Sequence, residues 1–301
     1  MPGTFFGPYN ENFSDYAEPA GGNAGRFPLG HYLILPDGRK FRFALNDGTV
    51  EVAGRLYQSS APIGNHTDQN TDVARAVGAT SVSATLGATS AAEDIYSEGV
   101  VHVNDQDGEG YAWRIARAIA NAQAHAAVAA SGVLTVVLEA GEEVQVALTA
   151  SSSQLTFTRN RFHQILIAPT TLTGSLAGVS PGVTIANRYY WSQVGGEAAV
   201  LADKVLFVGQ MVQASNNTAG AVESAKTNVR TGATAPGDSA ALGANPLDSS
   251  GTESAITLIN TVSTATYDIS GPASIRGPLV GVCKVVNITA EEALIDLTFL
   301  D

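Results

Sequence analysis

The sequence predicts an all-β protein, built from many short antiparallel strands in a sandwich-like or barrel-like arrangement with at most one or two short helices. The first observation is composition: the 301 residues include 31 glycines and only 7% aromatic residues, while alanine and valine supply much of the apolar class. This mixture favours short strands that approach closely and turn tightly. The second is the alternation of apolar and polar residues in many short runs. The third is a pair of hairpin turns, Asp37-Gly38 and Asp47-Gly48, between such runs.

The first 29 residues are expected to form an extended arm. Prolines occur there too often for a helix or a central strand. Aromatic rings between the prolines would not be left in water without cause, so the arm should lie on an apolar surface of a neighbouring molecule or of its own domain. The candidate anchors for binding a partner are Phe5, Phe6, Tyr9, Phe13 and Tyr16.

Residues 30–175 are expected to form a β-rich domain that opens with a three-stranded meander. The meander strands span 31–35, 39–45 and 49–57. Glycine accepts the positive φ that the two intervening turns require, which favours hairpins at both places. In the middle strand Phe41 and Phe43 share one face, so that face should pack while the other stays wet.

The rest of this domain is mostly strand, with one ambiguous segment. Residues 58–94 fit short strands and loops equally well. If the run from Tyr111 is a strand, Tyr111, Trp113 and Ile115 lie on one face of it. The alanine-rich residues that follow favour a helix instead. We predict a strand to about residue 120, followed by a loop or one short helix. The other predicted strands are 99–104, 133–140, 142–150, 153–159 and 162–169.

Residues 176–301 are expected to form a second β-rich domain. Its predicted strands are 183–193, 198–202, 204–215, 221–226, 254–260, 265–269, 279–289 and 292–300. Residues 227–252 carry almost no large apolar side chain and are predicted to be a surface loop. The aromatic run Tyr189, Tyr190 and Trp191 could stack sugars or bases, but such a cluster more often belongs to a sheet core or a subunit contact.

Charge and composition exclude several functional classes. The formal net charge of -12 argues against direct binding of nucleic acid. No run approaches the roughly 18 apolar residues of a membrane span, and the first residues lack the pattern of a signal peptide, so we expect a soluble protein made in the cytoplasm. The single cysteine, Cys283, rules out an internal disulfide and a cysteine metal cluster, and its apolar surroundings predict a buried side chain.

No motif predicts catalysis, a cofactor or a metal. Residues 178–182 match G-x-S-x-G, but a strand rather than a helix is expected after the serine, so we interpret them as a turn. An EF-hand over 105–109 would place Val103 and Arg114 at ligand positions, which neither can fill. These residues are therefore predicted to form a turn, with a weak cation site near Asp105 and Asp107 left open. The five histidines show no metal-binding spacing.

Residues 189–226 and 277–301 resemble the head decoration, or cement, proteins of tailed bacteriophages. The resemblance lies in the aromatic strand, the alternating short strands, the small-residue turn near Ala219-Gly220 and the closing apolar run. It implies a non-enzymatic β-rich virion protein, often a homotrimer, on the outer surface of the capsid. Its partner would be the major capsid protein, whose subunits it would bridge. The aromatic arm suits this role, because an extended segment can add a strand to a neighbour or lay rings into its grooves.

Two other functions remain as alternatives. A major capsid or tail-tube subunit is one, but a major capsid subunit usually has a long amphipathic spine helix, and the one candidate, residues 112–130, lacks a wide Leu/Ile stripe. A receptor- or carbohydrate-binding β-protein is the other, motivated by residues 189–191 and the polar loop 227–252. No carboxylate lies close to that aromatic run in the sequence.

Overall fold

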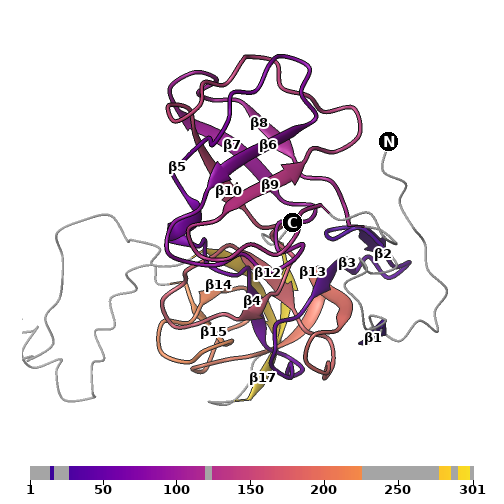
Figure 1. Ribbon diagram of the computed structural model, residues 1–301. Coiled ribbons are helices and arrows are strands. Elements are labelled where there is room, and N and C mark those ends of the chain that lie inside the picture. Colours follow the sequence, from indigo (N-terminus) through magenta and orange to yellow (C-terminus); the bar gives the residue numbers. More distant parts are fainter. Residues whose placement is uncertain (1–13, 17–26, 119–123, 226–277, 286–290, 299–301) are drawn as a thin grey trace, which may run out of the picture. The chain divides into compact units, whose positions relative to one another are not determined.

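The structure, a computed structural model, is an all-β protein, which confirms the predicted fold class (Figure 1). It describes residues 14–16, 27–118, 124–225, 278–285 and 291–298. Within these residues the only helical element is a single 3-10 turn, η1 (Gly64–His66). Every pairing between two named strands is antiparallel.

The strands fall into two groups with separate sheets. We call residues 60–160 the insertion and the other described residues the body. The strands of the body are β1 (Ser14–Tyr16), β2 (Tyr32–Ile34), β3 (Lys40–Leu45), β4 (Leu56–Gln58), β11 (Leu166–Ile167), β12 (Leu176–Val179), β13 (Tyr189–Leu201), β14 (Met211–Ala214), β15 (Val222–Ser224), β16 (Leu279–Val285) and β17 (Glu292–Leu297). The strands of the insertion are β5 (Gln69–Asn70), β6 (Ser81–Thr85), β7 (Val100–Asp105), β8 (Ala112–Arg114), β9 (Val133–Val137) and β10 (Gln154–Thr158).

The body forms one 11-stranded sheet, and the insertion interrupts it. The main path of this sheet is β11-β4-β12-β13-β17-β16-β14-β15, with β1 and β3 also paired to β13 and β2 to β3. The insertion forms a four-stranded sheet, β5-β10-β7-β8, and a two-stranded sheet, β6-β9. The chain leaves the body after β4 and returns at β11, and these two strands are hydrogen-bonded neighbours, with Gln58 opposite Leu166. The insertion therefore starts and ends at adjacent points of the body sheet.

The expected division at residues 175/176 runs through this single sheet. The first half of β13 pairs with β3, from Tyr189 opposite Leu45 to Gly195 opposite Lys40. Strands from both expected domains therefore share one row of hydrogen bonds. The described residues up to Ser224 and those from 278 onward belong to one compact unit, which also crosses the expected boundary of the arm at 29/30. The expected surface loop 227–252 lies outside the described residues.

The predicted meander is only partly correct. The β2–β3 hairpin is confirmed, with Leu33 opposite Phe41. The third strand is wrong, because β4 begins at Leu56 and pairs with β11 and β12 instead of β3. The free edge of β3 is already occupied by β13, so residues 49–55 turn aside, and Glu51 forms an isolated antiparallel bridge with Thr184.

One long strand replaces two that the sequence predicted separately. β13 runs without interruption from 189 to 201, whereas strands 183–193 and 198–202 were expected. The register with β3 shifts between Gln193 and Gly195, and Gly196 has a φ of +75°. A β-bulge of this kind bends a strand and increases its twist. It separates the part of β13 that pairs with β3 from the part that pairs with β17.

Several other predicted strands are shorter or missing. Within the described residues 111–118, the ambiguous run is strand only at 112–114, where Trp113 is buried and Tyr111 before it is 40% exposed. Residues 119–123 lie outside the described residues. The prediction of a strand at 142–150 is wrong, because Leu148 makes only an isolated bridge with Arg75. In the insertion, many backbone groups form their hydrogen bonds in turns or with side chains. The alternation of apolar and polar residues does not reveal such bonds. The predicted strands 254–260 and 265–269 lie outside the described residues.

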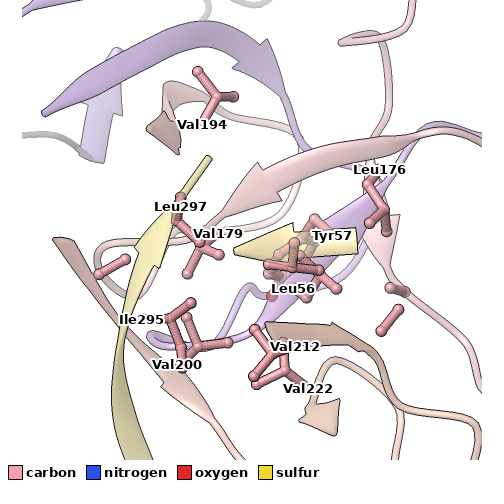
Figure 2. Close-up of a cluster of buried hydrophobic side chains, with 14 of the residues drawn as sticks. Leu56, Tyr57, Leu176, Val179, Val194, Val200, Val212, Val222, Ile295 and Leu297 are labelled. Carbon is pink, nitrogen blue, oxygen red and sulfur yellow. The ribbon is translucent and has the colours of Figure 1, made fainter. Parts of the chain in front are cut away.

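Each region has its own hydrophobic core. The larger body core, shown in Figure 2, draws on both ends of the sheet, including Leu56, Val200 and Ile295. A smaller aromatic cluster in the body surrounds Trp191. The core of the insertion surrounds Trp113, and every buried member of it lies between residues 82 and 157. The two tryptophans of the chain thus occupy different cores.

Candidate interaction surface

The predicted arm anchors fall mostly outside the part of the chain that the structure describes. Phe5, Phe6, Tyr9 and Phe13 belong to that undescribed part. The backbone of Tyr16 lies in β1, opposite Tyr189 of β13, and Ser14 lies opposite Tyr190. The backbone of residues 14–16 therefore pairs with the chain's own sheet. This agrees with the alternative that the arm lies on its own domain, at least for these three residues.

The aromatic run at 189–191 belongs to the core. Tyr190 and Trp191 are fully buried and Tyr189 is 6% exposed. The rings of Phe43 and Tyr189 stack with their centroids 5.2 Å apart, and Trp191 meets Phe43 edge-on at the same distance. Rings packed in this way offer no face to a sugar or a base. Of the two predicted places, a sheet core or a subunit contact, the structure shows the sheet core.

The G-x-S-x-G residues form a turn. β12 ends at Val179, and the hydroxyl of Ser180 donates to the carbonyl oxygen of Gly182 at 2.6 Å. Ser180 is fully buried, and the N–H of Gly54 donates to its carbonyl oxygen. No helix follows it before β13 in these described residues. The geometry that exposes a nucleophilic serine is therefore missing.

The acidic turn at 105–109 is held by its own hydrogen bonds. Oδ1 of Asp105 accepts the N–H of Gln106 at 2.8 Å, and Oδ2 of Asp107 accepts the hydroxyl of Thr149 at 2.6 Å. Gly108 has a φ of +87°, which a glycine adopts at low cost. The described residues contain no group of three His, Cys, Asp or Glu side chains placed to hold a metal ion.

A first apolar surface lies where residues 50–52 meet residues 183–185. The bridge between Glu51 and Thr184 turns both of these side chains inward, and each is 1% exposed. Alternation then points their neighbours outward. We call these neighbours the bridge patch; its members are 48–63% exposed and comprise Val50, Val52, Val183 and Ile185.

A second apolar surface lies at the turn between β13 and β14. The N–H of Gln210 donates to the carbonyl oxygen of Phe207 at 3.0 Å, and Gly209 and Gln210 are hydrogen-bonded to Cys283 of β16. Leu206 is buried in the body core, so its neighbours Val205 and Phe207 point outward. We give the name tip patch to the exposed apolar side chains of this turn, of the start of β14 and of the end of β16; its members are 41–68% exposed and comprise Val205, Phe207, Val208, Met211 and Val285.

Neither patch was found from the sequence, although a signal existed. The run 205–208 is Val-Leu-Phe-Val, four consecutive apolar residues, but only Leu206 is buried. A strand with one buried face needs only every second residue to be apolar. The surplus apolar residues were therefore a signal for an exposed face, which we interpreted as an ordinary strand.

A buried carboxyl group lies beneath the bridge patch. Burial raises the pKa of Glu51 to about 8, although the nearby hydroxyl groups of Tyr190 and Ser180 oppose the shift. Neither carboxyl oxygen makes a hydrogen bond of good geometry with the described residues. Glu51 is therefore uncharged at neutral pH, which allows it to lie in the interior.

Cys283 is buried, as predicted from the sequence, and burial raises the pKa of its thiol.

A shallow depression of about 280 Å³ lies near Ser180 and is lined by Arg39, Gln193 and Glu292 among others. The described residues include no helix with the length and hydropathy of a membrane span.

Comparisons with protein-family models, curated proteins and solved structures find no match to this chain. Inferences about function therefore depend on the surfaces and side chains described above.

Proposed function

We propose that this chain is a non-enzymatic decoration protein of a phage head, which binds the outer surface and bridges subunits of the major capsid protein. The observation that carries the proposal is the tip patch, with Phe207 and Val208 each 68% exposed. Contiguous apolar side chains on a soluble protein mark sites of protein–protein contact. The bridge patch supplies a second surface of this kind, and a protein that bridges two subunits needs at least two.

The position of the tip patch in the sequence supports the proposal. All five of its residues fall within 189–226 and 277–301, the two stretches that resemble decoration proteins. The arm anchors Phe5, Phe6, Tyr9, Phe13 and Tyr16 remain part of the proposal as additional contacts with the shell. The resemblance also implies a homotrimer, which sedimentation of the purified chain would test.

The two alternatives receive less support. A spine helix at 112–130 was the one candidate for a major capsid subunit, and the described residues 112–118 and 124–130 contain no helix. The aromatic run that suggested a carbohydrate platform is buried at Tyr190 and Trp191. The decoration role needs neither feature.

Cosedimentation with expanded empty heads of the phage that encodes this chain tests the proposal. We expect Phe207→Ser to reduce the bound amount by about tenfold or more, because a central aromatic anchor commonly dominates an interface. Val77→Ser is the matched control: Val77 is 62% exposed but belongs to the insertion, away from both patches in the sequence. Heads that do not bind the unmodified chain would contradict the proposal, as would equal binding by the two variants.

A further inference from the structure

Two buried histidines face the ring of Tyr96 inside the insertion. The ring centroids of His66 and His125 each lie 5.7 Å from that of Tyr96. All three side chains belong to residues that are at most 3% exposed. Since the histidines are 59 positions apart in the sequence (125 − 66), no spacing pattern could have predicted this cluster.

The hydrogen bonds determine which nitrogen of each ring carries the proton. Nε2 of His125 lies 3.0 Å from the backbone nitrogen of Tyr96, whose N–H can only donate. Nε2 must therefore present its lone pair, and Nδ1 donates to the carbonyl oxygen of Ala126 at 2.9 Å. His66 has the other tautomer: Nε2 donates to the carbonyl oxygen of Thr89 at 2.9 Å, and Nδ1 accepts from the Tyr96 hydroxyl.

Protonation of His125 breaks a hydrogen bond that the interior depends on. A second proton on His125 would face a backbone N–H, which cannot accept. The backbone donor of Tyr96 would then be left buried without a partner, and such a group costs about 1–3 kcal/mol. His125 is therefore the acid-sensitive member of the cluster.

The charged groups around His125 come from several segments. Burial lowers the pKa of His125. The hydrogen bond to the carbonyl oxygen of Ala126 and the charges of Asp94 and Glu93 oppose the shift, and His66 adds a small lowering effect. Oδ1 of Asp94 already accepts the backbone N–H groups of Ala124 and His125, at 2.8 and 3.1 Å.

Two further groups face the cluster from the segment that leads back to the body. Burial and the charge of Arg159 lower the pKa of His163 to about 4, with a smaller effect from His125. Burial lowers the pKa of Arg159, and the nearby Tyr96 opposes this shift. Because Arg159 is cationic, it opposes an additional positive charge at this place.

The cluster joins two segments of the insertion, 91–98 and 124–128. Ala91 and Val128 exchange both backbone hydrogen bonds, at 2.9 and 2.8 Å, and the N–H of Asp94 donates to the carbonyl oxygen of His125. Glu98, two residues beyond Tyr96, accepts the backbone N–H of Leu29 in the body at 2.5 Å. A change at Tyr96 therefore lies close to the contact between the two regions.

We propose that His125 is an acid-sensitive latch, whose protonation at Nε2 releases Tyr96 and separates segments 91–98 and 124–128 while the body remains folded. An open state binds the proton with the ordinary affinity of histidine, whereas the closed state resists it. The closed state is therefore favoured above about pH 6.5 and loses that advantage as the pH falls.

Hydrogen–deuterium exchange of the full chain tests the latch. Between about pH 7 and pH 5 we expect exchange in segments 91–98 and 124–128, corrected for its intrinsic pH dependence, to accelerate about tenfold. Strands β16 and β17 should not change. His125→Gln keeps an oxygen that can accept the N–H of Tyr96 but does not titrate, so the acid effect should fall below about twofold. His102→Gln, which removes another histidine of the insertion, should behave like the unmodified chain.

The proposal would be overturned if each segment were equally protected from exchange at pH 7 and at pH 5. An undiminished acid effect in His125→Gln would also overturn it. Nitrogen NMR of the unmodified chain provides a measurement that does not depend on a variant. We expect His125 as the Nδ1–H tautomer and His66 as the Nε2–H tautomer at neutral pH. Observation of His125 with its proton on Nε2 would reject the latch even if His125→Gln did not fold.

Discussion

The body and the insertion use similar short strands but join them in different ways. The body is held by one shared strand, β13, which pairs with β1, β3, β12 and β17. The insertion has two small sheets and several isolated bridges, and buried polar side chains such as His66 and His125 connect its loops. A long shared strand supplies backbone hydrogen bonds directly, whereas loops must satisfy buried backbone groups with side chains.

The same comparison extends to charge. Each region buries an ionisable side chain in its uncharged form: Glu51 in the body and His125 in the insertion. The stability that depends on an uncharged carboxyl group is lost as the pH rises, because the group then ionises. The stability that depends on an uncharged imidazole is lost as the pH falls, because the ring then becomes protonated. These two groups should therefore respond to pH in opposite directions.

The largest expected effects come from removing the tryptophan of each core. Trp113 is 1% exposed and Trp191 is fully buried, so replacement by alanine should destabilise the affected region by about 3–5 kcal/mol. Each variant leaves one tryptophan, which reports on the other region during urea unfolding. We expect the transition seen by Trp191 to persist in Trp113→Ala. Loss of that transition would show that the two cores unfold as one, which would contradict the division into a body and an insertion with separate cores.

Glu51→Gln tests the charge difference in the body. The raised pKa of Glu51, about 8, means that the unfolded chain releases a proton that the folded chain retains. Stability from this group is present below about pH 4.5 and is lost as the pH rises towards 8, by up to about 5 kcal/mol. Glutamine does not titrate, so the variant should lose this dependence in unfolding curves at several pH values. Glu109→Gln, at an exposed position, should retain it.

Glu98→Ala tests the contact between the regions. Glu98 is 6% exposed, and its Oε1 lies 2.7 Å from Nε of Arg117, while Oε2 accepts the N–H of Leu29. Removing the carboxylate should cost about 2 kcal/mol, because it removes an acceptor from a partly buried cation and from a backbone donor. We expect the unfolding midpoints reported by Trp113 and Trp191 to move apart. If both midpoints shift equally, Glu98 does not couple the two regions.

The smallest expected effect on stability comes from deleting residues 1–13. This deletion keeps β1 and its pairing with β13, so the free energy of unfolding should change by less than about 0.5 kcal/mol. Under the proposed function, binding to expanded heads should nevertheless fall, because Phe5, Phe6, Tyr9 and Phe13 are removed. Undiminished cosedimentation by the folded truncation would reject a role for these four residues.

Much of the fold was predictable, and the failures have identifiable causes. The β2–β3 hairpin was found because Asp37-Gly38 marks its turn in the sequence itself. The third meander strand was missed because β13 competes for the edge of β3, and that competition has no local signal. The tip patch left a trace as surplus apolar residues at 205–208, but exposure depends on what the rest of the chain covers.

The sequence by itself determined that the chain is all-β and where several strands alternate, and it favoured a sheet core or a subunit contact for Tyr190 and Trp191. These properties follow from neighbours along the chain, since side-chain alternation and turn chemistry act over a few residues. The tertiary structure alone decided that β3 pairs with β13, that an insertion separates β4 from β11, and that His66 and His125 meet at Tyr96. Partner choice between distant segments depends on which surfaces bury each other and satisfy each other's hydrogen bonds, and that is settled only when the whole chain is packed.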